Sequence, residues 1–278
     1  MLGNTQLIFK KNHIFIIKLK RETILFKDHM TNTILFEPGN YQFIPGVFQY
    51  SGGVSAQSGF RIERVRFSEP IPLLEGFKKI EGILKTAGRP LTAFCACELR
   101  SPAPFDEAGF EAFNRDYVGT LEKWGLIEGK TNPVARSNVC PEINPPKVPS
   151  IHAFCFTVQD SLSLPSFVVS GSAEAPEGMG DYKNHIVNLG DISAPGLEKK
   201  AKFVLDEMEN RMSKLGFKWA DTTATQVYTV HDIHNIMIKE LVRRGAMKSG
   251  LTRHFNRPPV INLEYEMDCR SVHVERVI

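Results

Sequence analysis

Two short strings, VFQYSGG at residues 47–53 and SFVVSGS at residues 166–172, decide the fold of this 278-residue chain. Each string ends an apolar, strand-like run on a turn of serine and glycine, and each opens a similar order of helices and strands. Equivalent points lie about 120 residues apart, at Ser51 and Ser170, Gly88 and Gly216, and Arg136 and Arg257. Repetition at this length indicates a duplicated domain rather than a solenoid.

The periodicity of apolar residues predicts the elements of each half. A spacing of three to four residues, typical of one buried helical face, predicts helices over residues 72–87, 106–124, 195–215 and 232–247. Short apolar runs predict strands over residues 42–53, 61–67, 91–99, 150–158, 166–172, 222–230 and 263–274. Helices packed on mixed sheets give an α+β fold. We therefore expect a first domain at residues 30–160, a second at 161–278, and a peripheral N-terminal extension at 1–29.

The distribution of charge argues against a nucleic-acid partner. The formal net charge is +3, from 34 Lys and Arg against 31 Asp and Glu. Residues 1–29 hold six basic and two acidic residues, so the rest of the chain is nearly neutral. Nucleic-acid-binding domains instead gather Lys and Arg into a basic surface. We expect no nucleic-acid partner.

Cysteine usage and hydropathy favour a cytoplasmic chain. The five cysteines are odd in number and include no Cys-x-x-Cys pair, which argues against a disulfide framework and a zinc site. No apolar run approaches the roughly 20 residues of a membrane span, and the run at residues 14–17 is too short for a signal peptide. We expect a cytoplasmic protein with no membrane partner.

Two strings in the first half concentrate polar side chains. CELRSPAPF at residues 97–105 places Glu98 and Arg100 two apart at a strand end, so both point to one face. NPVARSNVCPE at residues 132–142 places Arg136, Ser137 and Asn138 in what we expect to be a loop too polar for a core. The alternatives to a functional role are an exposed ion pair of small energy and a solvated loop.

The C-terminal region holds a denser charged span. The strings HFNRPPV at 254–260 and EYEMDCR at 264–270 contain Arg257, Glu264, Glu266, Asp268 and Arg270. Alternation puts the last four on one strand face, where three carboxylates repel one another unless they are paired or hydrated. A bidentate guanidinium is the natural partner of a planar carboxylate. Arginines among carboxylates therefore predict a site for a small organic acid.

Cofactor motifs do not occur in the sequence. It has no GxGxxG string after a strand, no P-loop and no GxSxG string. His231 and His234 lie three apart, but two histidines alone favour solvated or capping roles over metal binding. We expect no metal and no organic cofactor.

The half-repeats resemble the YjgF/Rid family, whose members are often labelled L-PSP. The resemblance rests on the two Ser-Gly turns, the glycines that end the first helix of each half, FNRDY at 113–117 and above all VARSNV at 134–139. Strings such as PIPLLEGF at 70–77 and CELRSPAPF resemble a narrower group, the two-domain 2-aminomuconate or 2-amino-5-chloromuconate deaminases. This resemblance extends from about residue 36 to the last residue. It implies two tandem Rid-like (chorismate-mutase-like) domains, each a mixed β-sheet packed by two helices.

The resemblance also implies an activity, hydrolytic deamination of an enamine or imine carboxylate without a cofactor. By analogy, Arg136 would grip the carboxylate next to the imine, and Glu98 and Glu264 would transfer protons. The remaining candidates would bind the water or amine and a distal carboxylate of the substrate: Ser137, Asn138, Arg100, Arg257 and Arg270. Rid active sites lie between the subunits of a trimer, so a homo-oligomer, with a trimer favoured, is implied as well.

Two other functions stay open at this level. Chorismatases also carry Rid-like folds and act on an enol-ether dicarboxylate, and many Rid-like proteins are known only as binders of small acids. The two halves also differ, since His152 stands where the second half has Glu264. The Asn-x-x-Tyr string formed by Asn114 and Tyr117 is missing from the second helix of the second half. One half could therefore be structural only.

Overall fold

The computed structural model describes residues 18–19, 22–23, 33–162, 164–179 and 181–278. The chain divides into two units, Met1–Thr31 and Asn32–Ile278. In the first unit, β1 (Lys18–Leu19) pairs antiparallel with β2 (Glu22–Thr23). Most of the extension expected at residues 1–29 lies outside the described residues, so its peripheral placement stays a prediction.

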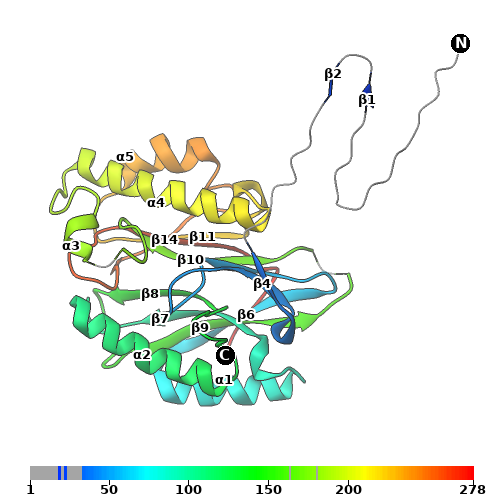
Figure 1. Ribbon diagram of the computed structural model, residues 1–278. Helices are drawn as coiled ribbons and strands as arrows, with labels where there is room; N and C mark the ends of the chain where they lie inside the picture. Colours follow the sequence, from blue (N-terminus) through cyan, green and yellow to red (C-terminus); the bar gives the residue numbers. More distant parts are fainter. Residues whose placement is uncertain (1–17, 20–21, 24–32, 163, 180) are drawn as a thin grey trace, which may run out of the picture. The chain divides into compact units, whose positions relative to one another are not determined.

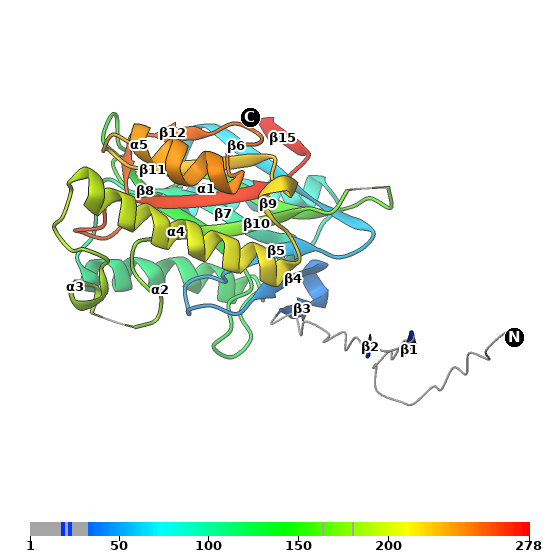
Figure 2. The same ribbon diagram turned by 90° about the horizontal axis from the view of Figure 1, so that it is seen from above.

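The second unit is built in four layers, with two mixed sheets stacked between two layers of helices (Figures 1 and 2). The order of the seven-stranded sheet is β12 (Thr252–His254), β11 (Ala224–Tyr228), β14 (Glu266–Ser271), β10 (Phe167–Ala173), β5 (Gly53–Ala56), β4 (Tyr41–Ile44) and β3 (Ile34–Phe36). The order of the six-stranded sheet is β13 (Asn256–Arg257), β8 (Ala135–Pro141), β7 (Phe94–Arg100), β9 (Ser150–Gln159), β6 (Phe60–Pro72) and β15 (Val274–Val277).

Each sheet contains the same four-stranded core, which shows the duplication in the topology. In one sheet the order is β8-β7-β9-β6, and in the other it is β12-β11-β14-β10. The first pair of each core is parallel and the other two pairs are antiparallel. The α+β class and the two mixed sheets expected from the repeat are confirmed.

The two halves also complete each other's sheets. β3, β4 and β5 of the first half extend the sheet that contains β10, while β13 and β15 of the second half join the other sheet. The boundary expected at residues 160 and 161 falls in the connection between β9 and β10. The division into two domains stays a prediction, because these exchanged strands tie the halves together.

Helices cover the outer face of each sheet. The six-stranded sheet is packed by α1 (Leu73–Thr86) and α2 (Glu107–Lys123), and the seven-stranded sheet by α4 (Ala194–Leu215) and α5 (His234–Ile236), which continues as the π-helix η4 (Met237–Val242) (Figure 1). The remaining short helices are α3 (Tyr182–His185), η1 (Glu37–Gly39), η2 (Leu91–Ala93) and η3 (Trp219–Asp221). Among the described helices, none has the length and apolar character needed to cross a membrane.

Local sequence signals explain where the long helices begin and end. The Asp106 carboxylate accepts a hydrogen bond from the Gly109 N–H at 2.7 Å, and Ser193 Oγ accepts one from the Gly196 N–H at 3.2 Å. Both are N-caps that satisfy an unpaired amide of the first turn. At the other end of α4, Gly216 takes a φ of +85°, a conformation that favours glycine and ends the helix. The predicted helices at 72–87, 106–124 and 195–215 are confirmed within two residues.

Four of the expected elements differ from the structure. The strand expected at 42–53 is interrupted, because β4 ends at Ile44 and β5 begins only at Gly53. The helix expected at 232–247 is divided into short α5 and η4, and the strand expected at 263–274 ends at Ser271 before β15 joins the other sheet. The loop expected around Arg136 is wrong, because residues 135–141 form the buried strand β8. The strand is buried although it is polar, because the rings of Tyr117, Tyr50 and Phe113 enclose the Arg136 guanidinium.

Polar side chains concentrate between the two sheets, whereas the apolar cores lie between each sheet and its helices. Along β14, Glu266, Asp268 and Arg270 share one face by their register with β11, as the alternation predicted, and all three are buried. The five cysteines are free thiols and all are buried, which confirms the expected absence of a disulfide framework. The inter-sheet layer is therefore where buried charge, and with it chemistry, is found.

Candidate functional site

The two Ser-Gly strings of the repeat meet between the sheets, and the second lies inside strand β10 rather than in the expected turn. Ser170 Oγ donates to the Ser51 carbonyl at 2.6 Å and accepts the Arg136 N–H at 3.1 Å. The Ser51 N–H in turn donates to the Val134 carbonyl at 2.8 Å. The repeated serines thus bind the start of β8 from both halves, and they place Arg136 beside the end of β10.

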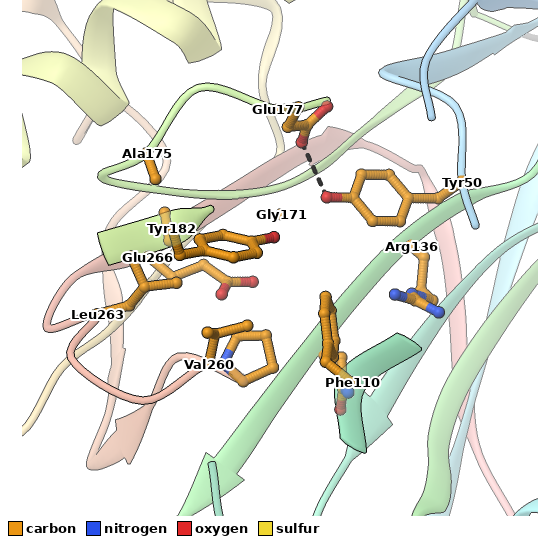
Figure 3. Close-up of a pocket in the computed structure, with 13 residues that line it drawn as sticks. Tyr50, Phe110, Arg136, Gly171, Ala175, Glu177, Tyr182, Val260, Leu263 and Glu266 are labelled. Carbon is orange, nitrogen blue, oxygen red and sulfur yellow. Dashed lines mark hydrogen bonds between the residues drawn. The ribbon is translucent and has the colours of Figure 1, made fainter. Parts of the chain in front are cut away.

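A pocket opens at this junction, with walls from both halves of the chain (Figure 3). Its cavity volume is about 40 Å³. It is lined by Tyr50, Phe110, Arg136, Asn138, Gly171, Ala173, Ala175, Glu177, Tyr182, Pro259, Val260, Leu263 and Glu266. Neither half of the chain alone forms this pocket.

The Arg136 guanidinium is buried among aromatic rings on one side of the pocket. Its Cζ lies 4.8 Å from the ring centre of Tyr117, 5.0 Å from that of Tyr50 and 5.7 Å from that of Phe113. These rings stabilise the cation and exclude water from it. Its Nη1 has no hydrogen-bond partner among the described residues, and the same holds for Nδ2 of the neighbouring Asn138. Two free donors at a buried cation form a site for a carboxylate.

Glu266 lies across the pocket from Arg136, beside Tyr182 (Figure 3). Burial raises the pKa of Glu266 well above its ordinary value, and the negative charge of Asp268 two residues along β14 adds to the rise. The positive charges of Arg136 and Arg100 oppose that rise without reversing it. The raised pKa favours the protonated, neutral form of the Glu266 carboxyl, the form that can donate a proton.

Gly171 gives the Glu266 carboxyl its space. A Cβ at this position would lie 2.3 Å from Glu266 Oε1 and 3.0 Å from Ser137 Cβ. Any larger residue would push the carboxyl away, so Gly171, which lies within strand β10, is required by close approach rather than by its backbone angles.

Tyr50, Glu177 and Tyr182 also line the pocket. The Tyr50 hydroxyl donates to Glu177 Oε1 at 3.0 Å (Figure 3), and Arg211 Nη2 binds the same oxygen at 2.8 Å. Burial raises the pKa of Tyr182 to about 12, so its hydroxyl stays neutral over the pocket. Tyr50 comes from the first half and Tyr182 from the second, which again requires both halves.

Three of the residues predicted from the sequence lie deeper between the sheets, around an inner cavity lined by Glu98, Ser137, Asp268 and Arg270. Arg64 Nε donates to Glu98 Oε1 at 2.6 Å. Burial by itself raises the pKa of Glu98, but the charges of Arg64, Arg270 and Arg100 outweigh it and hold that pKa well below the ordinary value. Glu98 is thus a paired, ionised carboxylate.

The arginines predicted to bind a distal carboxylate are mostly engaged by acidic residues of the chain. Arg270 binds Glu275 through Nε at 2.7 Å and Nη2 at 3.3 Å. Arg257 binds Glu142 and lies 3.6 Å from Glu264. Arg100 Nη2 has no hydrogen-bond acceptor among the described residues and lies 3.7 Å from a Glu98 oxygen. Arg136 and Asn138 are the predicted binding residues that the structure brings into the pocket.

Glu264 lies outside the residues that line the pocket. Its carboxylate binds His231 Nε2 at 2.7 Å, and it precedes β14, which begins at Glu266. Alternation alone does not separate Glu264 from Glu266, because two residues along a strand return to the same face. Sequence reasoning missed Tyr50, Glu177 and Tyr182, of which only Tyr50 adjoins a Ser-Gly string, at Ser51.

A duplicated α+β fold thus carries a pocket, lined from both halves, that contains a buried arginine and a buried carboxyl group. The chain belongs to the 2-aminomuconate deaminase CnbZ family, whose model matches residues 33–276. This confirms the narrower resemblance found in the sequence.

One relative by sequence agrees with this assignment. A 2-amino-5-chloromuconate deaminase from Comamonas testosteroni is 49% identical over 251 residues, which cover 90% of this chain and 100% of that protein. Among solved structures, a chorismatase matches 82% of this chain and 79% of its own at 12% identity, with a TM-score of 0.47. The YjgF gene product from E. coli matches 39% of this chain and 80% of its own at 15% identity, with a TM-score of 0.29.

Proposed function

We propose that this protein is a cofactor-independent, hydrolytic deaminase of an enamine or imine carboxylate of the 2-aminomuconate type. The observation that carries the proposal is the pair formed across the pocket by Arg136, with its free Nη1, and Glu266, whose pKa burial raises well above its ordinary value. Membership of the CnbZ family and the 49% identical relative support the choice of substrate class.

In the proposed reaction, Arg136 and Asn138 hold the carboxylate next to the amine-bearing carbon. Glu266 gives its proton to the neighbouring carbon of the enamine double bond, which leaves an iminium ion and a Glu266 carboxylate. A well-positioned acid of this kind contributes about 10²- to 10⁴-fold to the rate. The ion pair between the new carboxylate and the iminium stabilises the charge that this step creates.

Hydrolysis follows with the same residue acting as the base. The Glu266 carboxylate takes a proton from a water that adds to the iminium carbon, which gives a carbinolamine. Glu266 then protonates the nitrogen, ammonia leaves, and the remaining hydroxyl returns its proton to Glu266 as the carbonyl forms. One water is consumed, one ammonia and one 2-oxo acid are produced, and Glu266 ends protonated as it began.

The test measures ammonia release from 2-aminomuconate and from 2-aminoacrylate-type imines, and pyruvate release from chorismate. We expect ammonia from 2-aminomuconate and none from the same protein carrying Glu266→Gln. Pyruvate released from chorismate would replace this proposal with a chorismatase-like activity. Small acids that shift the melting temperature without any ammonia release would make the protein a binder.

The assembly and compartment belong to the same proposal. We propose a cytoplasmic homo-oligomer, with a trimer favoured by the resemblance to Rid proteins, and a small carboxylic acid as the ligand rather than nucleic acid or membrane. Reduced cysteines support this compartment, since all five are buried free thiols. Light scattering on the purified chain measures the assembly, and a monomer in solution would contradict it.

A further inference from the structure

A buried ion pair lies behind the strand end that carries Glu266. Glu174 follows β10 and Lys200 lies in α4, and the side chains of both are fully buried, with Lys200 Nζ 3.2 Å from Glu174 Oε1. Moving two charges out of water is costly, and well-packed apolar residues of similar volume often stabilise a fold as well or better. Fold stability alone therefore does not explain why Glu174 and Lys200 are both buried here.

Both carboxylate oxygens of Glu174 bind the backbone that leads into Glu266. Oε1 accepts the Glu264 N–H at 2.7 Å, and Oε2 accepts the Tyr265 N–H at 3.0 Å. Hydrogen bonds from backbone N–H groups to a carboxylate are short and strong, and two neighbouring ones fix the orientation of both peptide planes. The next residue is Glu266, so Glu174 fixes the position of the backbone that leads into the proposed proton donor.

Lys200 joins this strand end to the segment that carries Tyr182. Its Nζ also donates to the Val187 carbonyl at 2.8 Å, while the Val187 N–H donates to the Glu174 carbonyl at 2.9 Å. Residue 187 closely follows α3, the short helix that begins with Tyr182 at the pocket. One ion pair thus connects the Glu266 strand, the Tyr182 segment and α4.

The charges at this pair depend on each other. Burial raises the pKa of Glu174, while Lys200 and the backbone N–H groups act in the opposite direction. If either partner is removed alone, an unpaired charge stays buried, which costs far more than loss of the whole pair. A test of position therefore has to remove both charges together.

We propose that Glu174 and Lys200 are positioning residues that hold the Glu266 carboxyl in line with a substrate bound at Arg136. The role rests on the proposed deamination, in which a proton passes from Glu266 to a carbon of the substrate. Neither residue lines the pocket, so each acts through the backbone of residues 264–266 and the segment that carries Tyr182.

The deciding variant is the double substitution Glu174→Gln and Lys200→Met, which removes both charges at nearly constant size. We expect a fall in kcat of about 10²-fold, because a displacement of about 1 Å in a catalytic group has an effect of this size. KM changes by less than about threefold, since the carboxylate site at Arg136 is untouched. Amide hydrogen exchange at Glu264 and Tyr265 becomes faster while the rest of β14 keeps its protection.

Met208→Ala is the matched control on the same helix. Met208 is fully buried in the apolar core beneath α4 and does not line the pocket. It lowers the melting temperature but leaves kcat and the exchange at residues 264 and 265 unchanged. A double variant with wild-type kcat and wild-type exchange at these amides overturns the positioning role. If the unaltered protein releases no ammonia, the proposed function fails, and the exchange measurement still decides whether Glu174 holds this backbone.

Discussion

Replacing Gly171 with alanine tests whether the placement of the Glu266 carboxyl limits the reaction. The new Cβ would lie 2.3 Å from Glu266 Oε1, whereas ordinary contacts begin near 3.4 Å. Ser137 Cα and Cβ lie 3.2 and 3.0 Å away on the other side, so the methyl group itself has little room to retreat. The carboxyl is the flexible partner, and we expect it to move by about 1 Å.

The size of the effect follows from this displacement. A shift of about 1 Å in a catalytic group lowers the rate by about 10²-fold, equal to about 2.7 kcal/mol in the barrier. KM should change little, because Arg136 and Asn138 keep their places. The extra methyl group also costs about 1–3 kcal/mol of folding stability, so the melting temperature falls.

The assay is steady-state ammonia release at a temperature where circular dichroism shows the variant fully folded. Gly82→Ala is the control, because Gly82 lies in α1 and a Cβ there meets nothing within 4 Å. That variant should keep its kcat and gain up to about 1 kcal/mol of stability from better helix propensity. A folded Gly171→Ala protein with wild-type kcat would refute the assignment of Glu266 as the proton donor.

Three further predictions concern single charged groups. Arg136→Ala should raise KM by about 10²-fold, since a buried charge pair lost from one side costs about 2–5 kcal/mol, and kinetics unchanged on every enamine acid would remove its role. Glu266→Gln should abolish ammonia release and raise the melting temperature more at pH 8 than at pH 4. The sign follows because a carboxyl whose pKa is raised by folding contributes stability below its unfolded pKa and loses it as pH rises; an equal change at both pH values would contradict the protonated state. Burial, with Arg100 next, lowers the pKa of His152 to about 3, so stability should fall as pH drops from about 6.5 toward that value. His152→Gln should flatten this acid limb in thermal melts, and an unchanged limb would show that other groups cause it.

The sequence predicted the repeat and its long helices well. Helices α1, α2 and α4 follow from apolar residues at helical spacing and from their caps and end glycines, all of which lie within a few residues of one another. These are local interactions, so their pattern is visible in the chain itself. The VARSNV string likewise pointed to Arg136, which lies in the pocket.

The environment of that arginine was less visible. Polar residues around Arg136 indicated a solvated loop, yet β8 is buried because Tyr117, Tyr50 and Phe113 enclose the guanidinium. One of these rings is more than 80 residues away along the chain, and contacts of that kind leave no periodic signal. The same reason explains why Glu98 and Arg100, correctly placed on one face, turned out to belong to an inner ion network rather than to the pocket.

The choice between Glu264 and Glu266 shows most clearly where local pattern stops. Both lie in one acidic string with the same alternation, so sequence spacing treats them alike. The strand begins only at Glu266, because Glu174 binds the N–H groups of the two preceding residues and Ala173 pairs with Glu266 across β10 and β14. The helices, the repeat and the candidate acid-binding residues could be predicted from the sequence, because their patterns involve residues that are close together along the chain. The sequence did not show that Glu266 is the carboxyl that faces Arg136, or that these two residues come from opposite halves. Both facts depend on how strands distant in sequence pair, which is decided only in the folded chain.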